Sequence, residues 1–131
     1  DPPVILGVLN GAFMFTSELV RKLHIECYVD FCRVSSYPNG PDLKKQPQIT
    51  CPPKIDVTGR DVYIVEDIVD TGETVECLKE FLAEKGAARI YVVSLIKRES
   101  DTRSLIDFFG LDDNELKRNY RNIYKKNMNG W

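Results

Sequence analysis

The stretch from Val62 to Thr74 reads Val-Tyr-Ile-Val-Glu-Asp-Ile-Val-Asp-Thr-Gly-Glu-Thr, and it predicts a buried strand that runs into an acidic turn. The continuous apolar run from Val62 to Val65 is typical of a strand that is covered on both faces. Two adjacent carboxylates, Glu66 and Asp67, follow it, and a helix is expected from about Thr74 to Lys85. The segment therefore indicates a strand-turn-helix unit of an α/β fold.

Apolar runs and helical patterns alternate along the rest of the chain. The expected elements are strands at residues 4–9, 25–32 and 89–97 and a helix at residues 12–23, with a break at Asn10-Gly11. Strands that alternate with helices imply right-handed crossovers and a mainly parallel sheet. Such sheets bind ligands at the carboxyl ends of their strands. Asn10, Glu66 and Lys97 are all expected at these ends.

The segment from residue 35 to residue 56 interrupts this alternation. It holds Pro38, Pro41, Pro47, Pro52 and Pro53, five of the seven prolines in the chain. An irregular stretch of this length inside a compact domain is usually a lid or a disordered loop. We therefore expect residues 35–56 to form a mobile loop with a functional role.

Composition indicates one compact domain whose partners are small molecules. The chain has 131 residues, of which 43% are hydrophobic, and this suits a single core. A formal net charge of −2 provides no positive field for nucleic acid or for an anionic membrane. Because no apolar run could span a bilayer and no signal-peptide pattern opens the chain, we expect a cytoplasmic protein.

The cysteines and the first residues add two further expectations. The four cysteines show no C-x-x-C pair and no metal-ligand spacing with His24, so we expect buried, reduced thiols. Asp1 is not an initiator methionine, and Pro2-Pro3 runs directly into an apolar strand. We therefore expect that an N-terminal part of the domain is missing from this sequence.

The turn after residue 65 has the chemistry of a sugar-phosphate site. Backbone N–H groups at the start of a helix attract anions, Gly72 permits a close approach, and the hydroxyls of Thr71 and Thr74 add donors. Phosphate alone would not require the carboxylates of Glu66 and Asp67, which suit vicinal ribose hydroxyls or a hard cation such as Mg²⁺. The alternative to a sugar-phosphate site is a purely structural turn, in which Asp70 and Glu73 form a capping box for the helix and Glu66 and Asp67 are solvated.

At these residues the sequence resembles the phosphoribosyltransferases, and within them the hypoxanthine-guanine (6-oxopurine) branch. The signature of that branch is a strand followed by Glu-Asp-Ile-x-Asp-Thr-Gly-x-Thr, and residues 66–74 match every fixed position. The resemblance also covers Leu9-Asn10-Gly11, Ser36-Tyr37 and Lys97. Relatives that act on adenine or orotate generally lack an aspartate at the position of Asp70. The implied fold is a mainly parallel sheet flanked by helices, with a small hood.

The resemblance implies a role for each residue of the acidic turn. Glu66 and Asp67 would bind the ribose hydroxyls and the metal, and Asp70 would face N7 of the purine as acid/base. The expected cradle of the 5′-phosphate consists of Thr71, Gly72, Glu73 and Thr74. These roles assign the whole turn to phosphoribosyl pyrophosphate and to the reacting purine.

Two other segments receive roles from the same resemblance. Leu9-Asn10 would form a non-proline cis peptide, so that Asn10 and Gly11 bind pyrophosphate through backbone N–H groups. Lys97 would donate a hydrogen bond to the 6-oxo group of the purine. The alternatives are an ordinary Asn-Gly turn at residues 10–11 and a solvent-facing strand end at Lys97.

The last third of the chain departs from the family pattern. Gly110 to Glu115, followed by Arg118, is similar to the family element that carries an arginine for pyrophosphate. Asp112 in this element is assigned to the purine and to the metal. The preceding stretch is short, so either Phe108 or Phe109 could stack on the purine, and Phe108 is the residue that we assign. Residues 99–131 would form the hood and the C-terminal region of a single domain that spans residues 1–131.

The activity that the resemblance implies is purine salvage. A Mg²⁺-dependent enzyme would transfer the phosphoribosyl group from phosphoribosyl pyrophosphate (PRPP) to guanine or hypoxanthine and release pyrophosphate. The mobile loop, with Ser36 and Tyr37 at its head, would close over the site and exclude water. The resemblance also implies a homodimer or homotetramer. The alternatives are a non-catalytic, nucleotide-sensing regulator on the same fold and a general α/β phosphate-binding domain.

Overall fold

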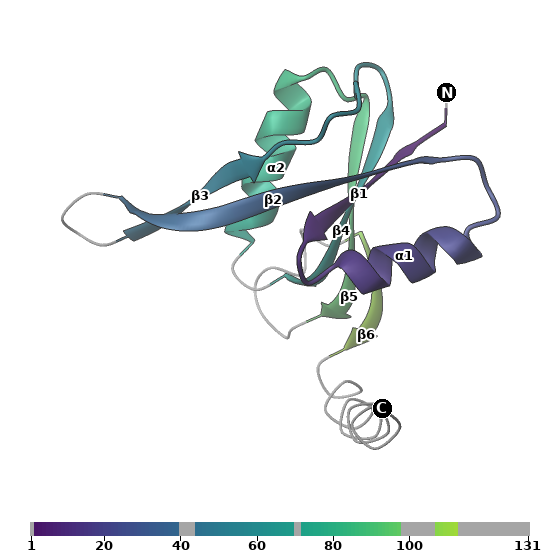
Figure 1. The fold of residues 1–131 in the computed structure, drawn as a ribbon, viewed down its shortest axis with the longest axis horizontal. Helices are drawn as coiled ribbons and strands as arrows, with labels where there is room; N and C mark the ends of the chain where they lie inside the picture. Colours follow the sequence, from purple (N-terminus) through teal and green to yellow (C-terminus); the bar gives the residue numbers. More distant parts are fainter. Residues whose placement is uncertain (1, 40–43, 70–71, 98–106, 113–131) are drawn as a thin grey trace.

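The fold is one sheet with a helix on each face (Figure 1). The computed structural model describes residues 2–39, 44–69, 72–97 and 107–112. The elements are β1 (Val4–Leu9), α1 (Phe13–Lys22), β2 (Tyr28–Asn39), β3 (Lys44–Cys51), β4 (Asp61–Val69), α2 (Glu73–Glu84), β5 (Arg89–Lys97) and β6 (Phe108–Asp112). The sheet has the order β3-β2-β1-β4-β5-β6. All neighbouring strands are parallel except β2 and β3, so the expected mainly parallel α/β sheet is confirmed.

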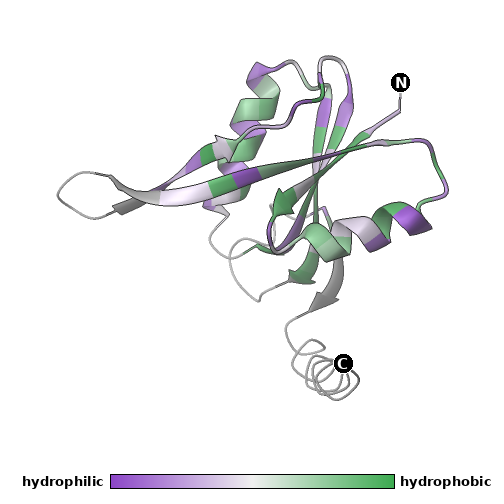
Figure 2. Cartoon of the chain, viewed as in Figure 1, coloured by the Kyte–Doolittle hydropathy of each residue, from purple (hydrophilic) through white to green (hydrophobic). Residues whose placement is uncertain are grey.

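The two faces of the sheet are covered by different helices. Val4, Leu6 and Val8 of β1 pack in one apolar cluster with buried residues of α2, including Leu78 and Leu82. The residue between them, Ile5, belongs to a second cluster with residues of α1, as expected from the alternation of side chains along a strand. Figure 2 shows hydrophobic residues concentrated on the central strands of the sheet. Each fully buried leucine contributes about 1.5–3 kcal/mol.

The segment expected to be an irregular loop is instead largely a β-hairpin, so that part of the prediction was wrong. β2 continues to Asn39, and β3 returns antiparallel to it, with Ser36 opposite Pro47 and Tyr37 opposite Gln46. Strand prolines are tolerated where the backbone N–H needs no partner. β3 is an edge strand, and β1 pairs with β2 only as far as Arg33, so the proline content did not exclude strands here.

The thiols are free but differ in exposure. Cys32 is buried, Cys27 and Cys77 are half-buried, and Cys51 is exposed, so the expected burial holds for Cys32 but not for Cys51. Burial, followed by the charges of Glu66 and Asp30, raises the pKa of the Cys32 thiol to about 12. No helix in the described ranges is long and apolar enough to cross a bilayer.

Gly7 allows α1 to pack closely against β1. A Cβ atom at this position would lie 2.6 Å from Oγ1 of Thr16 and 2.7 Å from Cε1 of Phe31. Gly7→Ala should therefore lower the free energy of unfolding by about 1–3 kcal/mol, as overpacking of a core usually does. Urea unfolding measures the change. The double variant Gly7→Ala/Thr16→Ala should recover part of the loss, and equal stability of Gly7→Ala and wild type would contradict the close packing.

Candidate active site

Two polar turns meet at the carboxyl ends of β1 and β4. The strands are parallel neighbours, with Gly7 opposite Val65, so the turns that follow them lie on the same edge of the sheet. A Cβ atom on Gly11 would lie 2.8 Å from Cγ of Asp67 and closer still to one of its carboxylate oxygens. The structure therefore brings the Asn10-Gly11 turn and the acidic pair together in one site.

The first turn leads directly into α1. The Leu9–Asn10 peptide bond is cis, as the resemblance implied, so the segment is not an ordinary Asn-Gly turn. α1 begins at Phe13, and its first turn contains no acidic residue. The start of a helix carries a partial positive charge and free N–H groups, which favour a bound anion. This turn can therefore hold a phosphate group beside Asp67.

The second turn contains two carboxylates in different environments. Glu66 is only 8% exposed, and burial, followed by the nearby charge of Asp67, raises its pKa to about 8. Asp67 is half-buried and accepts a hydrogen bond of 2.8 Å from the backbone N–H of Ile68. Two close carboxylates in a partly buried position favour a cation or a hydrogen-bond donor as their partner.

The acidic pair fits the magnesium ion that the resemblance implies. Within the described ranges, no three His, Cys, Asp or Glu side chains are grouped closely enough to hold a metal. Mg²⁺, however, is usually bound by one or two carboxylates together with waters and substrate phosphates. Glu66 and Asp67 supply such carboxylates beside a phosphate-accepting turn.

The start of α2 forms the far side of the acidic turn. Asp70 and Thr71 lie outside the described residues. Gly72 is the N-cap in a left-handed conformation, with φ of 84°, and its carbonyl accepts the first helical hydrogen bond from Glu76. Glu73 is the first helical residue rather than the third, so the predicted alternative of a capping box from Asp70 to Glu73 is not supported. Thr74 is half-buried in the first turn.

The strand register also brings Lys97 and Asp112 to this edge. Lys97 pairs with Val69 of β4 on one side and with Asp112 of β6 on the other. Phe108 pairs with Val93, four positions earlier, so it lies roughly 13 Å from Lys97 along the strands. Its ring is 52% exposed and belongs to a cluster with Tyr63 and Tyr91. The structure thus does not bring Phe108 to the strand ends.

Other predicted residues lie further along the same edge or beyond the described ranges. Ser36 is an exposed residue of β2, and Tyr37 follows it in the strand. Arg118 lies outside the described residues.

Arg33 was not predicted from the sequence. Nη2 of this residue donates a hydrogen bond of 2.7 Å to Oδ1 of Asn10, and Arg33 pairs with Leu9, the residue before Asn10. The signal was present, because a basic residue directly followed the strand expected at residues 25–32. It was missed because only residues within recognised motifs were considered.

The raised pKa of Glu66 predicts a specific dependence of stability on pH in metal-free protein. Between an unfolded pKa of about 4.3 and the folded value near 8, the native state binds more protons than the unfolded state. The stabilisation from this group is therefore complete below the unfolded pKa and is lost as the pH rises through the folded pKa. Urea unfolding at pH 5.5 and pH 8.5, with a chelator present, should show that Glu66→Gln reduces the loss of stability between the two values.

The exposed glutamate Glu80 of α2 provides a matched control. Glu80→Gln should preserve the difference between the two pH values that the wild type shows. If Glu66→Gln also preserves it, the side chain does not hold its proton near neutral pH.

Comparisons with known proteins agree with this geometry. The family model for the phosphoribosyl transferase domain matches residues 1–119. A hypoxanthine-guanine phosphoribosyltransferase of Lactococcus lactis is 35% identical over 137 residues, which cover 92% of this chain and 72% of the relative. The corresponding protein of Streptococcus pneumoniae is 32% identical over 135 residues, which cover 92% of this chain and 73% of the relative.

Solved structures show the same fold. A hypoxanthine phosphoribosyltransferase from Staphylococcus aureus superposes with a TM-score of 0.74 at 29% identity, covering 85% of this chain and 61% of that one. The hypoxanthine-guanine phosphoribosyl transferase of L. donovani gives a TM-score of 0.76 at 32% identity, covering 83% and 62%. The chain therefore spans less than two thirds of the length of these solved proteins. It belongs to the phosphoribosyltransferase family, in the branch of the hypoxanthine-guanine phosphoribosyltransferases.

Proposed function

We propose that the chain transfers the phosphoribosyl group of PRPP to guanine or hypoxanthine, with Mg²⁺, and releases pyrophosphate. The observation that carries this proposal is the contact between Gly11 and the Asp67 carboxylate, which joins an anion-binding turn to an acidic pair. A pyrophosphate and a ribose in one substrate need these two environments side by side. The relatives named above support the choice of reaction.

The ribose phosphate would lie along the acidic turn. Glu66 and Asp67 would accept hydrogen bonds from the ribose hydroxyls and provide oxygen ligands for the metal. Thr71, Gly72, Glu73 and Thr74 would surround the 5′-phosphate at the start of α2, where Gly72 adopts a left-handed conformation as the N-cap.

The departure of pyrophosphate leaves positive character on the ribose and negative charge on the leaving group. Backbone N–H groups at Asn10 and Gly11, together with Arg118, would stabilise the charge on pyrophosphate. Bound Mg²⁺ would neutralise part of that charge, and Asp112 is proposed as a further metal ligand and as a contact of the purine. The two turns together thus serve the step in which the bond to pyrophosphate breaks.

The purine would be held at the ends of β4 and β5. Asp70 would exchange the proton at N7, and Lys97 would donate to the 6-oxo group. The stacking role of Phe108 remains a prediction, and its position opposite Val93 does not favour it over the neighbouring Phe109. Base recognition therefore depends chiefly on Asp70 and Lys97.

The β2–β3 hairpin is proposed to act as the lid of the site. It carries Ser36 and Tyr37 and extends beyond the last residue of β2 that pairs with β1. Closure over bound PRPP would exclude water that could otherwise hydrolyse the activated sugar.

The cellular setting and the assembly are also proposals. Four free thiols suit a reducing compartment such as the cytoplasm. We further propose that the protein forms a homodimer or homotetramer. The exposed Phe13 and Met14 of α1 are apolar residues that such an interface could cover.

Base choice tests the proposed reaction. When PRPP and Mg²⁺ are supplied with guanine, hypoxanthine or adenine, pyrophosphate should be released with the first two bases only. Lys97 can only donate hydrogen bonds, and adenine presents an amino donor at the same place, so discrimination of roughly 10⁴-fold is expected.

Lys97→Ala should raise KM for the oxopurines and narrow the preference for oxopurines over adenine. Equal turnover of adenine and hypoxanthine by the wild type would contradict the 6-oxopurine assignment, and no turnover of any base would favour a non-catalytic regulator.

Asp70→Asn tests the acid/base role. Asparagine retains the size of the side chain but cannot take a proton from N7, so kcat should fall by about 10²- to 10⁴-fold. The affinity for PRPP and the free energy of unfolding should change little. Steady-state kinetics with hypoxanthine measure kcat, calorimetry measures the affinity for PRPP, and urea unfolding measures the stability. An unchanged kcat would remove Asp70 from the chemistry.

A further inference from the structure

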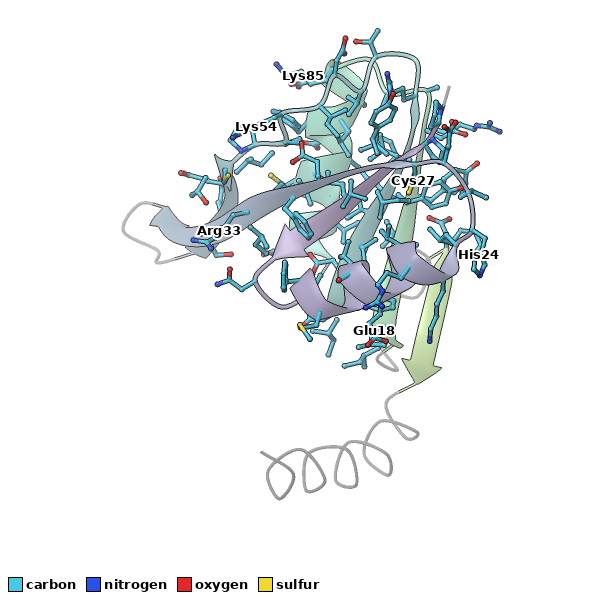
Figure 3. The ribbon with its side chains drawn as sticks, turned by 45° about the vertical axis from the view of Figure 1, so that its right-hand side comes forward. Glu18, His24, Cys27, Arg33, Lys54 and Lys85 are labelled. Atoms are coloured by element: carbon cyan, nitrogen blue, oxygen red, sulfur yellow. The ribbon has the colours of Figure 1, made fainter. Side chains whose placement is uncertain are left out.

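Arg33 lies in the middle of β2, at the last position where this strand pairs with β1, next to the pyrophosphate turn. It pairs with Leu9, the last residue of β1, so its backbone lies beside the start of the turn at residues 10–11. The pairing of β2 with β3 shifts register between Arg33 and Val34. Such bulges redirect the side chain beside them and often occur near active sites. The fold thus places an arginine beside the Asn10-Gly11 turn, and Figure 3 labels this residue on the ribbon.

The contacts of Arg33 leave its charge available to a ligand. Its exposed guanidinium donates to the side-chain oxygen of Asn10 at 2.7 Å, and this acceptor is neutral. The ion pair found within the described ranges joins Arg89 to Asp61, so in that part of the chain no carboxylate neutralises Arg33. A guanidinium has five N–H donors, and among the described residues the Arg33 guanidinium has only the bond to Asn10.

A cation at the position of Arg33 would reduce the electrostatic repulsion between bound pyrophosphate and the nearby carboxylate of Asp67. Pyrophosphate bound at residues 10–11 would lie close to Asp67, because Gly11 contacts that carboxylate. Bound Mg²⁺ and Arg118 are proposed to offset part of this repulsion, and a cation on β2 would add a positive partner from the side of the Asn10 side chain. Arginine suits this task because its planar fork binds two oxygens of one phosphate at once.

We propose that Arg33 is a pyrophosphate-binding residue, which contacts the pyrophosphate of PRPP and of the product while it holds the Asn10 side chain in place. This assignment rests on the proposed function and adds a residue to it. Arg33 lies where β2 still pairs with β1, so its contact with Asn10 is already made in the structure without ligand.

The test compares ligands that differ in pyrophosphate. Arg33→Gln should weaken binding of PRPP·Mg²⁺ and of pyrophosphate·Mg²⁺ by about ten- to a hundredfold, the usual loss for a charge-assisted hydrogen bond. Binding of GMP, which has a 5′-phosphate but no pyrophosphate, should change less than about threefold. Arg33→Lys keeps the charge but not the fork, so it should give an intermediate loss. Calorimetry with each ligand measures all three effects.

Arg89→Gln is the matched control. Arg89 makes an exposed ion pair with Asp61 where β4 and β5 begin, at the opposite edge of the sheet, so the same change of charge there should leave all three affinities unaltered. If Arg33→Gln binds pyrophosphate as wild type does, or weakens GMP equally, the proposal is wrong. If the wild type itself binds neither PRPP nor pyrophosphate, the proposed function fails instead.

A double-variant cycle separates direct contact from an effect through Asn10. In an Asn10→Ala background, Arg33→Gln should still weaken pyrophosphate·Mg²⁺ binding by about ten- to a hundredfold. If the loss disappears in that background, Arg33 only positions Asn10 and does not touch the anion.

Discussion

The site depends on the contact between Gly11 and the carboxylate of Asp67. Parallel pairing of β1 with β4 sets the distance between the two turns, and the absence of a side chain at Gly11 lets the backbone reach the acid. The neighbouring Glu66 is buried with a raised pKa, so negative charge is concentrated where little water can solvate it. Such an arrangement costs stability unless a cation or a donor is bound. The stability of the free site is thus lowered by the groups that bind the ligand.

The rest of the fold supports that contact from both sides of the sheet. α1 packs closely over Gly7 and starts immediately after the Asn10-Gly11 turn, so its positive end faces the same edge as the acids. α2 covers the other face through Leu78 and Leu82 and begins at Gly72. Beyond this core, β2 contributes Arg33 and then pairs only with β3, at the edge of the sheet. The strands of the sheet position the binding groups, and the β2–β3 hairpin is the part that we propose to close over them.

Local patterns predicted the elements that pack, and they failed at the β2–β3 hairpin, whose prolines indicated a loop. Val4–Leu9 and Arg89–Lys97 were correctly predicted as strands because continuous apolar runs need two covering layers. The strand after Tyr28 extends far beyond its predicted end, because its second half, which includes Pro38, pairs only with the edge strand β3, where a proline is tolerated. The motif located Asn10, Gly11, Glu66 and Asp67 at the same edge, and the structure confirms this. Arg33 was missed because it lies outside the family motifs, and its contact with Asn10 depends on the pairing of β2 with β1.

The most direct test of the account is a titration of isotope-labelled protein with PRPP·Mg²⁺, followed by backbone amide chemical shifts. If the two turns form one site, the largest changes should appear together at residues 10–11, 66–67 and 72–74. Amides near Asp61 and Arg89, at the opposite edge of the sheet, should barely move. Changes confined to one turn, or centred on the opposite edge, would contradict the claim that these turns bind a single phosphoribosyl pyrophosphate.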